Sequence, residues 1–148
     1  MRRFVFPLRS WLGLLGLGVL LVSGLSAQDE DLDLSLGSTI DNSVGMDWTL
    51  ADGQLVHLRL VNHQFCFFFL DAERKIVEPV YSRVILRGEE TRNKTNELLY
   101  TLSRGSGPYL THPRMHYPPY DYWLMIIIPS DLVEGDDAIV LSRGRFRQ

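Results

Sequence analysis

From residue 46 onward, apolar residues come in short runs separated by turn residues, and no stretch repeats them with the period of a helix. Residues 47–61 predict a β-hairpin, because Asp52 and Gly53 lie between two apolar runs and tolerate the positive φ that a tight turn requires. In the second arm, apolar and polar residues alternate from Val56 to Leu60. That alternation is typical of a strand with one apolar and one polar face.

Residues 65–70, Phe-Cys-Phe-Phe-Phe-Leu, predict a central strand that is apolar on both faces. Such a strand needs cover on both sides, so we expect the segment before the hairpin, or a partner, to lie on its second face. Further strands are predicted at residues 75–77, 80–86, 97–103, 120–128 and 138–142, with a charged loop at 88–96 and a loop rich in Gly and Pro at 104–119.

About seven strands, with turns roughly every eight to twelve residues and no helix, predict an all-β fold. An antiparallel β-sandwich is the first choice and a small barrel the second. The pattern is similar to that of immunoglobulin-like or fibronectin-like modules, although the Cys…Trp…Cys core of true immunoglobulin domains is absent. Such folds serve many functions, so the function has to come from particular residues.

The first 27 residues have the layout of a secretory signal peptide: three arginines, an apolar stretch, and small residues that end at Ala27. An uncleaved membrane anchor is the alternative, because residues 10–28 contain no charge and approach the length that spans a bilayer. Both interpretations predict export of the rest of the chain, to the periplasm or as a secreted protein. Contact with a membrane is expected only if this segment stays uncleaved.

Composition then divides the exported part into a leader, a domain and a tail. Residues 28–45 are acidic and then rich in Ser, Gly and Asn, which predicts a flexible acidic leader. Residues 46–143 form the predicted β-sandwich domain, and residues 144–148 form a basic tail. If that tail is extended, Arg143, Arg145 and Arg147 lie on one side of it.

Charge and cysteine content narrow the functional classes. After residue 27 the chain has 12 basic and 18 acidic residues, a formal net charge of −6, which argues against nucleic acid as a partner. The chain has one cysteine, so it has no internal disulfide. Cys66 lies in the doubly apolar strand, and we expect its thiol to be buried and inert.

The stretch THPRMHYPPYDYW, residues 111–123, combines metal-binding and aromatic side chains. His112, Met115 and His116 offer the borderline and soft ligands that suit copper in an exported protein. The stretch has to curl for these three side chains to meet, and the spacing matches no zinc pattern. Copper binding by this stretch is therefore the alternative hypothesis.

The same stretch, together with Tyr109 two positions before it, also suits the recognition of a partner. Tyrosines combine an apolar ring with a hydroxyl, which makes them good anchors of interfaces, and prolines stiffen the loop that carries them. We predict that this loop binds an envelope or extracellular protein or polymer, in an oligomeric state that the sequence leaves open. The predicted contact residues are Tyr109, Tyr117, Tyr120 and Tyr122.

Catalytic patterns are weak in this sequence. Gly105-Ser106-Gly107 lacks the spacing of a nucleophile elbow, and the acidic loop at residues 131–137 does not follow the order of a calcium loop. The sequence therefore predicts an exported binding or structural module without catalytic activity and without a cofactor. A periplasmic copper-binding protein is the alternative.

Overall fold

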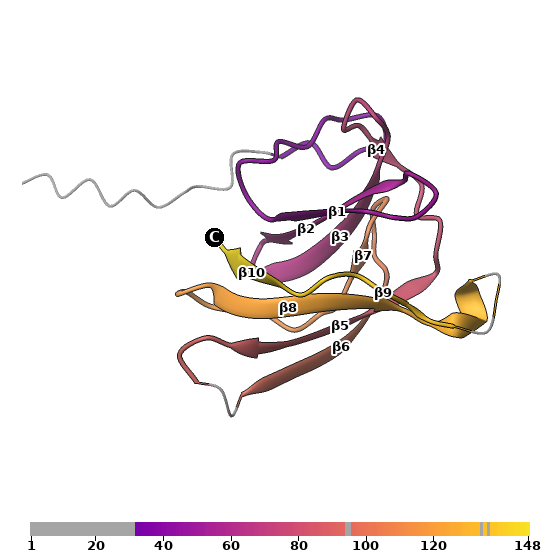
Figure 1. Cartoon of the computed structure of the whole chain (residues 1–148). Helices are drawn as coiled ribbons and strands as arrows, with labels where there is room; N and C mark the ends of the chain where they lie inside the picture. Colours follow the sequence, from indigo (N-terminus) through magenta and orange to yellow (C-terminus); the bar gives the residue numbers. More distant parts are fainter. Residues whose placement is uncertain (1–31, 94–95, 134, 136) are drawn as a thin grey trace, which may run out of the picture.

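The computed structural model describes residues 32–93, 96–133, 135 and 137–148, and these form an all-β, antiparallel fold (Figure 1). The predicted signal peptide and residues 28–31 of the predicted leader lie outside the described residues. Within the described ranges the only helical element is a single 3-10 turn, Ser130–Leu132, and no helix has the length and apolar character to cross a membrane. The prediction of an all-β antiparallel fold is confirmed.

Ten strands form one sheet in the order β1-β2-β3-β7-β6-β5-β8-β10, with β4 paired to β3 and β9 paired to β8. Their bounds are β1 Met46–Thr49, β2 Leu55–Val61, β3 Gln64–Leu70, β4 Ile76–Val77, β5 Arg83–Glu90, β6 Glu97–Arg104, β7 Leu110–Thr111, β8 Asp121–Ile128, β9 Ile139–Val140 and β10 Gly144–Arg147.

The predicted hairpin is β1 and β2, which pair from Met46↔Leu58 to Thr49↔Leu55 around a turn in which Gly53 has a φ of 86°. A second tight hairpin joins β2 to β3 through Asn62 and His63, both at positive φ. Side chains along β1 to β3 point alternately into and away from the centre of the molecule. These three strands therefore form one wall of the fold.

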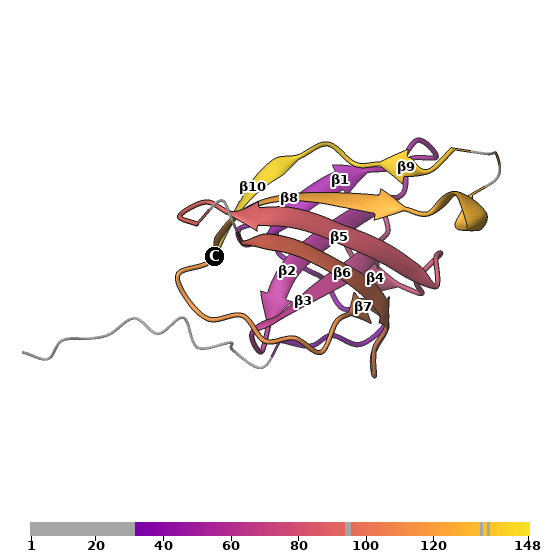
Figure 2. The same ribbon diagram turned by 90° about the horizontal axis from the view of Figure 1, so that it is seen from below.

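The sheet curls so that this wall faces the strands β6, β5, β8 and β10 (Figures 1 and 2). Strand β7 makes the turn between the two walls, although it is only two residues long: Leu110 and Thr111 pair with β3 on one side and with β6 on the other. Beyond these two residues β3 and β6 have no ladder between them within the described chain. This opening is where the loop after β7 lies.

Side chains bridge the two ends of the sheet, β1 and β10. Trp48 Nε1 donates a hydrogen bond of 2.9 Å to the carbonyl oxygen of Ser142. The side-chain amide of Gln148 bonds both the backbone N–H and the backbone C=O of Leu60, each at 3.0 Å. The curl thus stops short of a closed ladder, between a sandwich and a small barrel.

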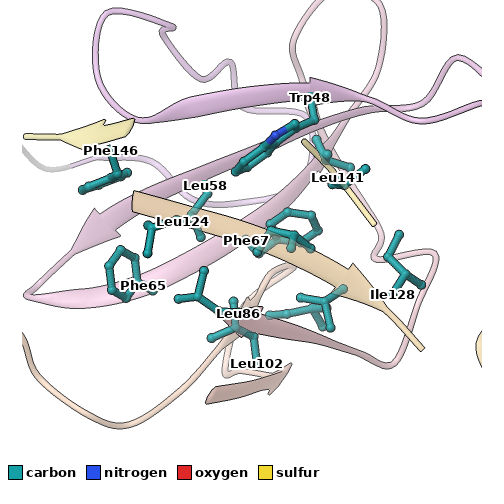
Figure 3. Packing of buried hydrophobic residues seen from close by; sticks show 14 of the residues in the cluster. Trp48, Leu58, Phe65, Phe67, Leu86, Leu102, Leu124, Ile128, Leu141 and Phe146 are labelled. Carbon is teal, nitrogen blue, oxygen red and sulfur yellow. The ribbon is translucent and has the colours of Figure 1, made fainter. Parts of the chain in front are cut away.

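The space between the walls holds the main hydrophobic core (Figure 3). Inward residues of both walls fill it, and the largest of its fully buried members are phenylalanines of β3 and β10. The labelled members in Figure 3 are Trp48, Leu58, Phe65, Phe67, Leu86, Leu102, Leu124, Ile128, Leu141 and Phe146.

A second, smaller cluster covers the outer face of β3, where Cys66, Phe68 and Leu70 are buried. Residues 32–45 lie across this face and bring Leu32, Leu34 and the fully buried Ile40 to it. The expectation that β3 is covered on both faces is confirmed, and the segment before the hairpin supplies the cover. We call residues 32–45 the covering segment. The sequence predicts them as part of a flexible leader, whereas in the structure they pack on the folded domain.

Two boundaries drawn from the sequence change. The predicted charged loop at 88–96 is shorter, because β5 continues to Glu90 and pairs with both neighbours almost to its end. The predicted basic tail at 144–148 is the strand β10, and Phe146 is fully buried in the core. Arg145 and Arg147 alternate with that phenylalanine and point outward. Because the strand is only four residues long and two of them are arginines, its sequence resembles that of a basic tail.

Candidate functional site

The loop that follows β7, residues 112–120, runs along the opening between β3 and β6 to the start of β8 (Figure 2). Hydrogen bonds hold it to the β2–β3 hairpin, and two of them are made by the backbone of the loop. The backbone N–H of His116 donates to the carbonyl oxygen of His63 at 2.7 Å, and the Gln64 side-chain amide donates to the carbonyl oxygen of Pro113 at 3.0 Å. The loop therefore has a defined position at one end of the fold.

His116 fills the opening itself. Its side chain is buried, and its ring centroid lies 4.7 Å from that of Phe65, 5.5 Å from that of Tyr100 and 5.9 Å from that of Tyr122. Burial, together with the charges of Arg114 and His112, lowers the pKa of His116 to about 4. The imidazole is thus neutral at physiological pH and packs as an aromatic ring.

Three of the four tyrosines predicted to bind a partner pack against the hydrophobic clusters. Tyr122 is a buried member of the main core, with its ring 5.8 Å from that of Phe65. Tyr109 packs against the second cluster, with its ring 5.3 Å from that of Phe68. Tyr120 is half-buried and packs against the main core, and Tyr117 is the exposed member of the four.

Tyr117 and Met115 are the exposed apolar residues of the loop, with exposed fractions of 67% and 51%. The hydroxyl of Tyr117 donates to Sδ of Met115 at 3.7 Å, and its ring lies 5.4 Å from that of His63. His63 Nδ1 in turn lies 2.5 Å from the hydroxyl oxygen of Tyr120. We call His63, Met115, Tyr117 and Tyr120 the Tyr117 patch.

Sequence reasoning did not place His63 in this patch, since 54 residues separate it from Tyr117. The signal was present only indirectly. Asn62 and His63 form a two-residue turn between two apolar runs, and this turn brings His63 to the end of the sheet where the loop passes. That the loop passes there depends on the long-range pairing of β7.

The three predicted copper ligands do not meet around one point, although His112 and His116 both lie against the ring of Tyr100. His112 stacks on Tyr100 with the ring centroids 4.7 Å apart, Met115 contacts the Tyr117 hydroxyl, and His116 lies among the buried rings. Within the described ranges, no group of three or more His, Cys, Asp or Glu side chains is placed to hold a metal ion. Glu134 and Asp136 of the acidic loop lie outside those ranges.

A second polar cluster lies beneath the covering segment. His57 is fully buried on β2, and its Nδ1 lies 2.6 Å from Oδ1 of Asp47 on β1. Arg74 donates to Oδ2 of the same carboxylate at 2.9 Å and, through Nε, to the carbonyl oxygen of Ile40 at 2.9 Å. The cluster thus ties β1 and β2 to the covering segment.

The electrostatics of this cluster suit a structural role. Burial lowers the pKa of His57, although the hydrogen bond that Asp47 accepts from the ring opposes this shift, so the imidazole is neutral. Bonds from Arg74 and His57 lower the pKa of Asp47 although burial opposes them. His57 Nε2 has no hydrogen-bond partner among the described residues and faces the backbone of Gly45. It therefore offers no accessible base.

Cys66 is buried on the outer face of β3, as predicted. Burial raises the pKa of its thiol to about 11, so the reactive thiolate is scarce at neutral pH.

No protein-family model, curated protein or solved structure matches the chain.

Proposed function

We propose that this protein is an exported binding module without catalytic activity, and that it holds its partner through the Tyr117 patch. The observation that carries the proposal is the exposure of Tyr117 and Met115 on a loop that is fixed to the β2–β3 hairpin. Large exposed side chains that are already ordered lose little entropy on binding, so they are favourable anchors. Export rests on the sequence pattern of the first 27 residues.

The chemistry of the patch indicates the kind of partner. Tyr117 and Met115 offer an aromatic ring and a polarisable thioether, which together accept apolar side chains of varied shape. Beside them the guanidinium of Arg114 lies 5.7 Å from the centroid of the Tyr100 ring. A segment of an envelope or extracellular protein that pairs an apolar side chain with a carboxylate fits this surface best.

Copper binding is the second hypothesis, and one observation favours it. His112 and His116 both lie against the ring of Tyr100, and His116 is neutral, as an imidazole ligand must be. Against it, Met115 is turned to Tyr117, and copper would have to reach a buried imidazole.

The test places a photo-cross-linking amino acid at position 117 of the full-length chain in cells. The matched control places it at Val80, which is also exposed but lies near the opposite end of β3 from the loop. We expect a discrete adduct from position 117 only, with a lower yield when Met115→Ser is added. Identical adducts from both positions, or none from position 117, would contradict the proposal.

A further inference from the structure

The outer side of β6, β5, β8 and β9 carries apolar side chains that no segment of the described chain covers. Leu99 and Val140 are 68% and 59% exposed, Trp123 is exposed, and the others are half-buried. In Figure 2, β5, β6 and β8 lie toward the viewer, and no described segment crosses them. We call the following residues the outer apolar face: Ile85, Leu99, Trp123, Met125, Ile127 and Val140.

This face is unusual for an antiparallel sheet, whose solvent side is normally polar. Along β8 the inward residues fill the core, yet the outward residues Trp123, Met125 and Ile127 are apolar as well. Strand β3 has the same doubly apolar pattern, and there the covering segment buries the second face. Contiguous exposed apolar surface marks an interaction site, so the outer face of β8 requires an occupant.

Strand register arranges this face in rows that run across the sheet. One row is Glu97, Glu89, Trp123 and Arg145, because each of these residues lies opposite the next on the neighbouring strand. It therefore begins with an acidic residue and ends with a basic one, while Glu89 in the row is already paired with Arg143 of the same chain.

A parallel row is Thr101, Ile85, Ile127 and Val140, by the same register. It contains no charge.

Each of these rows can face a second copy of itself that runs in the opposite direction, because acidic residues then face basic ones and apolar residues face apolar ones. A two-fold axis parallel to the strands, between β5 and β8, would place each row over the reversed row of a second copy. Glu97 would then lie opposite Arg145 of that copy, and Ile85 opposite its Ile127. Within the described ranges Glu97 has no ion-pair partner, whereas Arg145 already binds Asp121 at 2.8 Å and could extend that pair into a network.

We propose that the outer apolar face is the interface of a symmetric dimer, in which two copies pack these sheets face to face about that axis. Aligned packing of two twisted sheets is a common geometry, and a two-fold interface needs one self-complementary surface. Arg87, in the middle of the face, would lie over Met125 of the second copy and beside its Trp123, whose ring already has the guanidinium of Arg143 of its own chain 5.4 Å from its centroid. This surface is separate from the Tyr117 patch.

The test uses full-length chains that carry Thr101→Cys or Val140→Cys, expressed separately and together, and treated with a short bis-maleimide. These positions lie on β6 and β9, with β5 and β8 between them, and they face each other only across the proposed axis. Any product joins two chains, because each variant has one accessible cysteine and the native Cys66 is buried. We expect dimers from the mixture and none from either variant alone.

A second measurement addresses the centre of the interface. Ile127→Arg would replace the apolar row at the axis by two guanidinium groups, in addition to the two that Arg87 already contributes, and we expect it to raise the dimer dissociation constant at least a hundredfold in sedimentation experiments. Val80→Arg, off the face, should leave it unchanged. Equal cross-linking of the single variants, a monomer at all concentrations, or an adduct with a different protein on this face would each overturn the dimer.

Discussion

Asp47 and His57 are joined by a contact of 2.6 Å between Oδ1 and Nδ1, under the covering segment. The same carboxylate holds Arg74, which bonds the carbonyl oxygen of Ile40. We predict that Asp47→Asn lowers the free energy of unfolding by about 1–3 kcal/mol, because a partly buried charged hydrogen-bond network is lost. Urea denaturation measures the loss, and hydrogen exchange should show faster opening of residues 38–45.

The matched control for that substitution is Asp131→Asn. Asp131 pairs with Arg83, but both side chains are largely exposed, so the change should stay within about 0.5 kcal/mol. If the two variants lost the same stability, the Asp47 cluster would not fix the covering segment.

Gly45 provides a second test of the same region. Its φ is 99°, and a Cβ there would lie 2.4 Å from the backbone oxygen of Leu58 and 2.9 Å from the ring of His57. Gly37 has a similar φ of 83° but open space around it. We expect Gly37→Ala to cost about 1 kcal/mol and Gly45→Ala roughly 2–4 kcal/mol, since only the second adds a clash to the backbone strain. Equal losses in thermal denaturation would refute the close packing of Gly45 on His57.

The sequence was informative where a signal was local. Asp52-Gly53 fixed the first hairpin because turn chemistry acts over two residues. The run from Phe65 to Leu70 showed that both faces of β3 are buried, because side-chain alternation needs no knowledge of the partner. On β8, the same alternation places the apolar residues Trp123, Met125 and Ile127 on the outward face.

Features that depend on distant pairing were not predictable. Strand β7 is two residues long, and only its neighbours β3 and β6 make it a strand. The approach of His63 to Tyr117 follows from that pairing. Tyr122 is a predicted contact residue because tyrosines favour interfaces. The alternation of inward and outward side chains along β8, however, puts it in the core.

Phe146 tests whether the last residues belong to the domain. It is fully buried between Phe65 and Tyr122, with ring centroids 5.5 Å and 6.5 Å away. Phe146→Ala should lower the free energy of unfolding by about 3–5 kcal/mol, because it leaves a cavity in a packed core. Arg147→Ala, at an exposed neighbouring position, should change it by less than about 0.5 kcal/mol. If both substitutions changed the free energy of unfolding only slightly, residues 144–148 would be a tail and not part of the domain.

The buried imidazole of His116 predicts a pH dependence of stability. Its pKa is about 4 in the folded protein, against 6.5 for an ordinary imidazole. Above pH 6.5 both states are neutral at this position. Between pH 6.5 and 4 only the unfolded state gains the proton, so stability falls as the pH falls. The loss should be on the order of 2 kcal/mol, after allowance for partial solvent access.

The matched variant for this measurement is His116→Phe, which keeps an aromatic ring among Phe65, Tyr100 and Tyr122 but cannot titrate. The difference between wild type and variant is the relevant quantity, because contributions that the two proteins share cancel in it. It should be flat above pH 7 and decline toward pH 4. A difference that stays constant throughout would show that His116 titrates normally.

Copper distinguishes the two functional hypotheses most directly. A ligand that binds only the folded state at a hundred times its dissociation constant adds about 2.7 kcal/mol and raises the Tm by several degrees. Because His116 is buried among aromatic rings and Met115 is turned to the Tyr117 hydroxyl, we expect Cu(I) and Cu(II) to raise the Tm of the full-length chain by less than about 1 °C. Calorimetry with His112→Ala, which leaves the buried ring in place, is the control. A larger rise that disappears in this variant would show that the loop opens to bind the metal, and it would make copper binding the better account of residues 111–117.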